Sequence, residues 1–228
     1  MLGRILNVIF PPRCIFCGAF LPVWARVGIC DACYGKIPFM QNGDGGSDVD
    51  FSGRYCDEIV CVCDYAGIIR DALIRYKFFG RPAYGRTFAA LLSDRVKGLM
   101  ERHKFDMIIS VPLYRRKEWK RGFNQSYLIS KVLSRETGVA ECSRLLSRVK
   151  DTESQSLLNR SRRRTNIMNA FMVHHPDKIS NKTILLIDDI FTTGSTLEEC
   201  ARVLKEAGAK SVMAAVLASG RKSWPVKS

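Results

Sequence analysis

Two adjacent acids, Asp188 and Asp189, separate a run of branched apolar side chains from a cluster of threonine, glycine and serine, in the string ILLIDDIFTTGST at residues 184–196. The apolar run predicts a buried strand, and the cluster predicts a turn into a helix whose first backbone N–H groups are open to an anion. Carboxylates repel a phosphate, so the two acids must serve another part of the same ligand. Sugar hydroxyls or a divalent cation would satisfy them. The pattern therefore indicates a site for a phosphorylated ribose.

The turn after the acids excludes two common nucleotide-binding motifs. Gly194 permits close backbone approach, and Ser195 with Glu198 three residues later gives a capping-box pattern. Neither GxxxxGK[ST] nor GxGxxG occurs, which excludes a Walker loop and a Rossmann fingerprint. The alternative is a surface turn with two solvated acids, and the agreement of strand, acids and loop disfavours it.

Four of the nine cysteines form the pattern C-x2-C-x12-C-x2-C, namely Cys14, Cys17, Cys30 and Cys33. Two residues between thiolates let one tight turn aim both sulfurs at a single ion, and two such turns complete the tetrahedron that Zn²⁺ accepts. No position is left open, so we expect a structural zinc. The alternative is a set of buried or redox-active thiols. Three other cysteines fit small buried hydrophobes better than a second metal site: Cys56, Cys61 and Cys63.

The formal charge of +14 is concentrated in two segments. Residues 112–121 carry a local charge of +4, and residues 144–164 carry +5. Such clustering indicates a polyanionic partner. Basic loops that only keep the protein in solution are the alternative, although solubility does not require clustered charge.

Alternating strands and helices must position these groups. Strand patterns cover residues 58–65, 107–112, 183–188 and 211–218; helical patterns cover 67–80, 84–100, 124–136 and 195–207. This order predicts a parallel α/β sheet, in which ligands bind at the carboxyl ends of strands, and the acids follow such an end. We expect a basic loop after residue 112 and an exposed, mobile flap at residues 143–170, which are rich in Arg, Ser and Asn.

Three regions are expected along the chain. Residues 1–40 form a zinc-ribbon-like module, residues 41–56 a linker rich in Gly, Asp and Ser, and residues 57–228 the α/β domain. The apolar run at residues 5–10 is far shorter than the ~20 residues that span a bilayer, and no signal-peptide cleavage site follows it. We therefore expect no transmembrane segment and a cytoplasmic protein.

The string at residues 184–196 resembles the 5-phosphoribosyl-1-diphosphate (PRPP) signature of type I phosphoribosyltransferases. The likeness extends to the cysteine pairs, IRYKFFG (74–80), VPLYRRKEWKRGFNQ (111–125) and RRRTNIMNAF (162–171). With these motifs nearly the whole chain resembles the ComF family of competence proteins, which join zinc ribbons to a phosphoribosyltransferase-like domain. The resemblance implies a type I phosphoribosyltransferase-like parallel sheet with helices on both faces.

The resemblance also implies roles for individual residues. Asp188 and Asp189 would bind the ribose hydroxyls, directly or around Mg²⁺. The 5′-phosphate would bind to the turn, at Thr192, Thr193, Gly194, Ser195 and Thr196. The diphosphate loop would be Val111, Pro112 and Leu113, with basic side chains nearby at Arg115, Arg116, Lys120 and Arg121. Residues 143–170 would form the hood over the site.

Three functions follow from these expectations. The first is transfer of a phosphoribosyl group from PRPP with release of diphosphate. Purine-salvage enzymes carry an Asp that contacts the base at the position of Thr192, so no general base is evident in this chain. The second is binding of single-stranded DNA during uptake, with Trp119, Phe123 and Tyr127 between the basic residues. The third is an inactive scaffold that docks on competence machinery such as a DNA-uptake helicase, at the inner face of the membrane.

Overall fold

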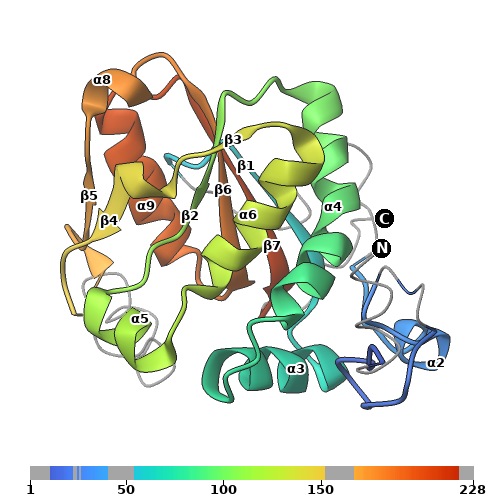
Figure 1. The fold of residues 1–228 in the computed structure, drawn as a ribbon. Helices are drawn as coiled ribbons and strands as arrows, with labels where there is room; N and C mark the ends of the chain where they lie inside the picture. Colours follow the sequence, from blue (N-terminus) through green and yellow to red (C-terminus); the bar gives the residue numbers. More distant parts are fainter. Residues whose placement is uncertain (1–10, 23–24, 26, 41–53, 152–166, 221–228) are drawn as a thin grey trace.

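The computed structural model describes residues 11–22, 25, 27–40, 54–151 and 167–220. A five-stranded sheet lies at its centre, and its strand order is β1-β7-β6-β2-β3. All neighbouring strands are parallel. The strands are β1 (Glu58–Asp64), β2 (Met107–Ser110), β3 (Ala140–Glu141), β6 (Thr183–Phe191) and β7 (Ser211–Ser219). The predicted parallel α/β sheet is confirmed (Figure 1).

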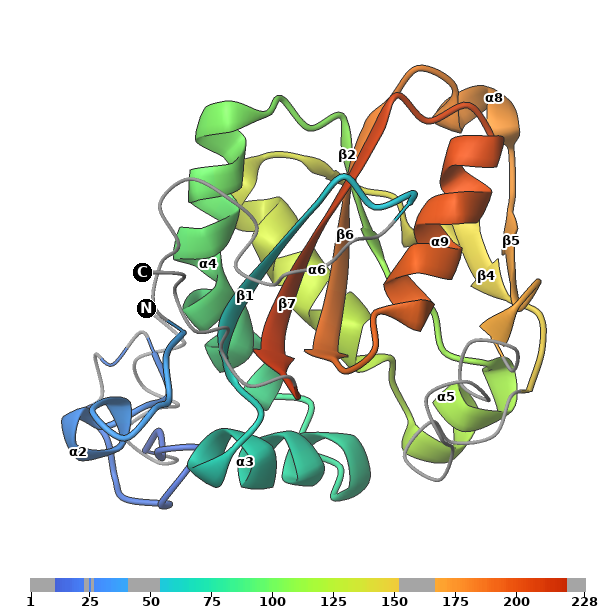
Figure 2. The ribbon, with the colours of Figure 1, turned by 180° about the vertical axis from the view of Figure 1, so that it is seen from behind.

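Helices cover both faces of this sheet, as predicted. On one face lie α4 (Tyr84–Arg102) and α6 (Gln125–Thr137), and α9 (Ser195–Glu206) lies on the other (Figure 2). Alternate residues of β6 point to opposite faces. Leu185 and Ile187 pack with α4 and α6, whereas Ile184 and Leu186 pack with α9. The strand is buried on both sides, which is why its sequence is an unbroken apolar run.

The first helix after β1, α3 (Gly67–Phe78), crosses the carboxyl edge of the sheet, as does α5 (Arg115–Arg121) (Figure 1). Tyr76 of α3 is fully buried, and its ring lies 5.2 Å from that of Phe88 near the start of α4. A Cβ atom on Gly85 would lie 2.8 Å from the Tyr76 hydroxyl and 3.1 Å from Leu128 Cβ, so only glycine permits this close approach.

A small antiparallel pair, β4 (Leu146–Arg148) and β5 (Phe171–Val173), lies beside α9, with η1 (Ser143–Leu145) before it and α8 (Pro176–Ile179) after it. The prediction of an exposed flap at residues 143–170 is wrong at both ends, because Leu146, Ile167 and Ala170 are buried in the core on the α9 side. These few apolar residues are the ones that anchor the segment. Residues 152–166 lie outside the described part of the chain.

The N-terminal module, which includes α2 (Asp31–Tyr34), packs directly against the α/β domain. Arg75 Nη2 of α3 donates to the carbonyl oxygens of Ile15 and Phe16 at 3.0 and 3.2 Å. Ile15 and Ile37 belong to the same apolar cluster as α4 and α6. The module therefore shares a core with the larger domain. Most of the expected linker, residues 41–53, lies outside the described residues.

Of the helices in the described ranges, none is both long enough and apolar enough to cross a membrane. The longest of them, α4, carries charged residues along its exposed side.

Candidate functional site at the carboxyl edge of the sheet

The two acids lie within β6, because the strand continues beyond them to Phe191. The predicted strand end at residue 188 is therefore too early: Ile190 and Phe191 still pair with β7. Asp189 is only 4% exposed, and Asp188 is half-buried. Adjacent strand residues point to opposite faces, so the two carboxylates have different neighbours.

Asp188 accepts two hydrogen bonds on Oδ1. One comes from Ser126 Oγ at 3.0 Å, and the other from the backbone N–H of Asp189 at 2.9 Å. Burial, together with the negative charge of Asp189, raises the pKa of Asp188 to about 7 despite these bonds and the nearby Lys77. Carboxylate oxygens are the ligands that a hard divalent cation such as Mg²⁺ prefers, so the acid pair fits such a cation.

Asp189 has a cation on each of two neighbouring segments. Lys77 Nζ of α3 lies 2.8 Å from Asp189 Oδ2. Arg121 is the last residue of α5. Burial of its guanidinium lowers the Arg121 pKa, and the nearby Asp189 carboxylate partly offsets this effect. Asp189 therefore lies between a lysine of α3 and an arginine of α5.

The turn after β6 presents the start of α9. Gly194 has a left-handed backbone with φ of 83°, and α9 begins at Ser195 with no side chain capping it. The predicted capping box is wrong, because Glu198 bonds elsewhere: its Oε1 accepts the backbone N–H groups of Arg54 and Tyr55 at 2.6 and 2.7 Å. The first turn of an uncapped helix offers N–H groups and a positive dipole end to an anion.

Within the turn, Thr193 Oγ1 and Ser195 Oγ are 2.9 Å apart and hydrogen-bonded. This contact folds the hydroxyl side chains of the turn onto the helix start. The five residues expected to hold a 5′-phosphate, 192–196, are thus contiguous at the edge to which the acids also belong.

The segment after β2 forms a helix rather than the predicted basic loop. Val111 is buried and Pro112 and Leu113 are half-buried, after which α5 runs from Arg115 to a left-handed C-cap at Gly122. The basic side chains that were expected to face the diphosphate divide into two groups. Arg121 is half-buried near Asp189, and three are exposed: Arg115, Arg116 and Lys120.

Three residues that the sequence reasoning did not single out complete the site: Lys77, Asn124 and Ser126. Asn124 Nδ2 donates to the carbonyl of Val111 at 3.1 Å, and its Oδ1 accepts the Ser126 N–H at 3.0 Å. The hydroxyl of Tyr76 donates to the carbonyl of Gln125 at 2.9 Å. The only signal was that Lys77 lies inside the string IRYKFFG and Asn124 inside RGFNQ, which Ser126 directly follows.

Aromatic side chains near the site are of two kinds. Phe123 packs against Tyr76 with ring centroids 5.4 Å apart, as expected of a core residue. Trp119 is 87% exposed on α5, and Phe78 and Phe79 at the end of α3 are also largely exposed. The guanidinium of Arg121 lies 5.4 Å from the centre of the Phe78 ring. The triple arginine at residues 162–164 lies outside the described residues.

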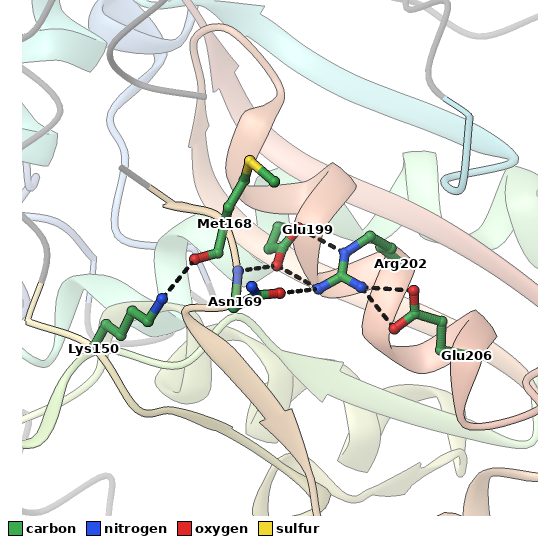
Figure 3. A network of polar contacts seen from close by, with 6 residues as sticks. All are labelled: Lys150, Met168, Asn169, Glu199, Arg202 and Glu206. Carbon is green, nitrogen blue, oxygen red and sulfur yellow. Dashed lines mark hydrogen bonds and ion pairs between the residues drawn. The ribbon is translucent and has the colours of Figure 1, made fainter. Parts of the chain in front are cut away.

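A polar network ties the returning end of the 143–170 segment to α9 (Figure 3). The backbone N–H of Asn169 donates to Glu199 Oε1 at 2.6 Å, and Arg202 binds Glu199, Glu206 and the Asn169 side chain. Lys150 Nζ donates to the carbonyl of Met168 at 3.1 Å. Glu199 is 7% exposed, so the centre of this network is shielded from water.

The four cysteines of the two CxxC pairs meet as predicted. Their sulfurs all lie within 4.8 Å of one another, and Cys17 Sγ is 3.7 Å from Cys30 Sγ. Four sulfurs each ~2.3 Å from one ion would be separated by distances of this size. Burial opposes ionisation of Cys14, but hydrogen bonds from neighbouring backbone N–H groups outweigh it and lower the pKa of that thiol to about 6. The cluster fits a structural zinc.

The remaining cysteines behave as small hydrophobes. Cys56, Cys61 and Cys63 are buried, and the Cys63 thiol donates to the carbonyl of Leu217 at 3.1 Å. Burial raises the pKa of Cys56 to about 12. Within the described residues the only group of three or more possible metal ligands is the four-cysteine cluster.

Comparison with known proteins agrees with this architecture. A phosphoribosyl transferase domain model matches residues 120–228, and a double zinc ribbon domain model matches residues 5–43. Competence protein F of Haemophilus influenzae is 32% identical over 215 residues, which are 88% of this chain and 93% of that protein. DNA utilization protein YhgH of Salmonella typhi is 36% identical over 68% of each chain.

Among solved structures, a purine phosphoribosyltransferase from Pyrococcus horikoshii is 18% identical and covers 61% of this chain and 78% of its own, with a TM-score of 0.38. The two domain models show that the chain joins a zinc-ribbon module to a phosphoribosyltransferase-like domain. It belongs to the ComF (competence protein F) family.

Proposed function

We propose that this protein binds PRPP together with Mg²⁺ at the carboxyl edge of the sheet and transfers the phosphoribosyl group, with release of diphosphate. One observation carries the proposal: Asp188 and Asp189 lie in the last part of β6, and two residues further on the chain turns into the start of α9, which no N-cap side chain covers. That arrangement offers acceptors to ribose hydroxyls and donors to a 5′-phosphate on one ligand.

Each part of the site has a role in this reaction. Asp188 and Asp189 hold the ribose as positive charge develops at its anomeric carbon, and residues 192–196 hold the 5′-phosphate. Arg121 and the exposed cations of α5 balance the negative charge that collects on the departing diphosphate. Bound Mg²⁺, held by the same carboxylates, would supply further positive charge to that leaving group. The bond to diphosphate breaks at the anomeric carbon as the bond to the acceptor forms there.

The test is calorimetric titration of PRPP with Mg²⁺ into the wild type and into Asp188→Ala/Asp189→Ala. We expect binding by the wild type and its loss in the double variant. Binding of equal strength to both proteins contradicts the proposal. A folded, zinc-loaded wild type that does not bind PRPP contradicts it too, and favours the scaffold hypothesis.

A second candidate function is contact with single-stranded DNA, as part of DNA uptake or use. It is favoured by Trp119, which is 87% exposed on a helix that also carries Arg115, Arg116 and Lys120. An exposed indole among cations is the combination that stacks on a base while the charges follow the backbone. The names of the two relatives above, which refer to competence and DNA utilization, agree with this role.

A further inference from the structure

The ion pair between Lys77 and Asp189 differs from the other lysine pairs at the molecular surface. The two side chains are 18% and 5% exposed, and Nζ lies 2.8 Å from Oδ2. By contrast, Lys97 and Asp94 on α4 are 65% and 91% exposed and 3.4 Å apart. Screening by water makes such a surface pair weak, whereas an ion pair shielded from water contributes more.

In the ligand-free protein, Lys77 therefore acts as the counter-ion of the acid pair. Its ammonium places a positive charge 2.8 Å from one of two adjacent carboxylates, whose negative charges would otherwise repel each other. A divalent cation bound by the acid pair would take Asp189 as a ligand, and Oδ2 of Asp189 already lies against the Lys77 ammonium. The ammonium and the cation consequently compete for this carboxylate.

A second group that could share an anion with the Lys77 ammonium lies close to it. Lys77 is the penultimate residue of α3, which ends beside exposed Phe78 and Phe79. Arg121 comes from α5 to the same point, and its Nη1 atom is buried without a hydrogen-bond partner among the described residues. One cation bound to Asp189 and another with an open donor together make a cradle for an anion with several oxygens.

We propose that Lys77 is a diphosphate-binding residue that exchanges partners. It neutralises Asp189 while the site is empty; when a cation-bound diphosphate enters, it leaves Asp189 to the cation and pairs with the diphosphate beside Arg121. This inference rests on the proposed function, because it takes the acid pair to be the cation and ribose site. The alternative is a permanent structural ion pair.

The test uses Lys77→Met, which keeps the length and the apolar contacts of the side chain, and Lys97→Met as the matched control. Each protein is titrated with Mn²⁺ alone and with inorganic diphosphate in the presence of Mg²⁺. We expect Lys77→Met to bind Mn²⁺ about tenfold more tightly and Mg²⁺–diphosphate about tenfold more weakly, since a charged hydrogen bond is of that order. Lys97→Met should match the wild type in both titrations.

The opposite signs of the two changes distinguish partner exchange from a structural role. A permanent ion pair predicts weaker or unchanged binding of both ligands in Lys77→Met, and that result overturns the inference. Lys77→Arg keeps the charge and replaces Lys77→Met as the test if the methionine variant does not fold. We expect Lys77→Arg to bind Mg²⁺–diphosphate within about threefold of the wild type. A loss of affinity of about tenfold in Lys77→Arg would show that the positive charge is not what binds diphosphate, and it overturns the inference. Neither Mn²⁺ nor diphosphate contains ribose, so these titrations test Lys77 separately from PRPP binding. If PRPP does not bind the wild type, the proposed function is contradicted, and the titrations still test the role of Lys77.

Discussion

The side-chain amide of Asn124 donates to the backbone carbonyl of Val111, 3.1 Å away, and so ties the start of α6 to the end of β2. The same side chain caps α6, because its Oδ1 accepts the N–H groups of Ser126 and Tyr127. Ser126 in turn donates to Asp188. One buried asparagine thus links the loop after β2 to the acid pair.

Substitution of Asn124 should separate its two tasks. Asn124→Ala removes both the helix cap and the buried bond, and we expect the free energy of unfolding to fall by about 1–3 kcal/mol. Asn124→Asp keeps the capping oxygen and loses the donor to Val111, so a smaller loss is expected. Urea denaturation measures both, with exposed Arg135→Ala as a control expected within about 0.5 kcal/mol of the wild type. Equal losses in the alanine and aspartate variants would show that the cap contributes nothing.

The raised pKa of Asp188 makes stability depend on pH in a definite direction. The folded state holds a proton on this carboxyl up to a pH of about 7, whereas the unfolded chain releases it near the ordinary value of 3.8. Between these values the folded state binds more protons, so the contribution to stability falls as pH rises from about 4 to about 7. The groups that act on Asp188 are Asp189, Lys77 and Ser126, and from the α9 side also Arg148 and Cys200.

Asp188→Asn removes this titration while keeping the shape of the side chain. Urea denaturation at several pH values measures the free energy of unfolding of both proteins. As pH rises from about 4 to about 7, the wild type should lose stability relative to Asp188→Asn. A difference that is constant with pH would mean that Asp188 titrates normally in the folded protein.

The four-cysteine cluster should hold one zinc per chain. Elemental analysis of the purified protein should give one equivalent, and Cys30→Ser should lose it, together with thermal stability, because Ile15 and Ile37 of the module belong to the shared core. Cys142→Ser, outside the cluster, serves as the control and should retain the metal. Two equivalents in the wild type, or retention of zinc in Cys30→Ser, would refute the single structural site.

The two carboxylates that bind Arg202 should differ in their effect on stability. Glu199 is 7% exposed and also accepts the Asn169 N–H, whereas the Glu206 side chain is 57% exposed. We expect Glu199→Gln to lower the free energy of unfolding by about 1–3 kcal/mol and Glu206→Gln to change it by less than about 0.5 kcal/mol. Thermal or urea unfolding measures the stability of both variants. Similar losses at the two positions would show that burial of Glu199 adds nothing to the stability of the network.

Binding of single-stranded DNA, if α5 performs it, should respond differently to loss of a ring and loss of a charge. Trp119→Ala should weaken binding by about 1–3 kcal/mol and leave the salt dependence unchanged. Lys120→Gln should weaken binding less and reduce the slope of log affinity against log salt by about 0.7. Replacing Arg162, Arg163 and Arg164 with Glu should both weaken binding and flatten the slope. Anisotropy titrations at several salt concentrations measure all three variants, and unaltered affinity in every one would exclude these surfaces.

Much of the fold could be predicted from local patterns. The branched apolar run before Asp188 indicated a buried strand. The apolar periodicity from Asn124 to Glu136 indicated the helix that the structure places at residues 125–137. The spacing of the cysteines indicated their convergence. Each of these signals lies within a few residues of the feature that it predicts, because strand pleat, helix pitch and tight turns are set by neighbours in the chain.

What only the tertiary structure decided lies between residues that are distant in sequence. Nothing near Lys77 shows that its ammonium will lie 2.8 Å from Asp189, and nothing near Glu198 shows that it will bind the backbone of Arg54 and Tyr55 rather than cap its own helix. Both contacts depend on the strand order, in which β7 lies between β1 and β6. The sequence alone determined the chemistry available at the site, since that depends on residue types and spacing. The packing of α3, α5 and the start of α9 at one edge of the sheet decided which charges meet there.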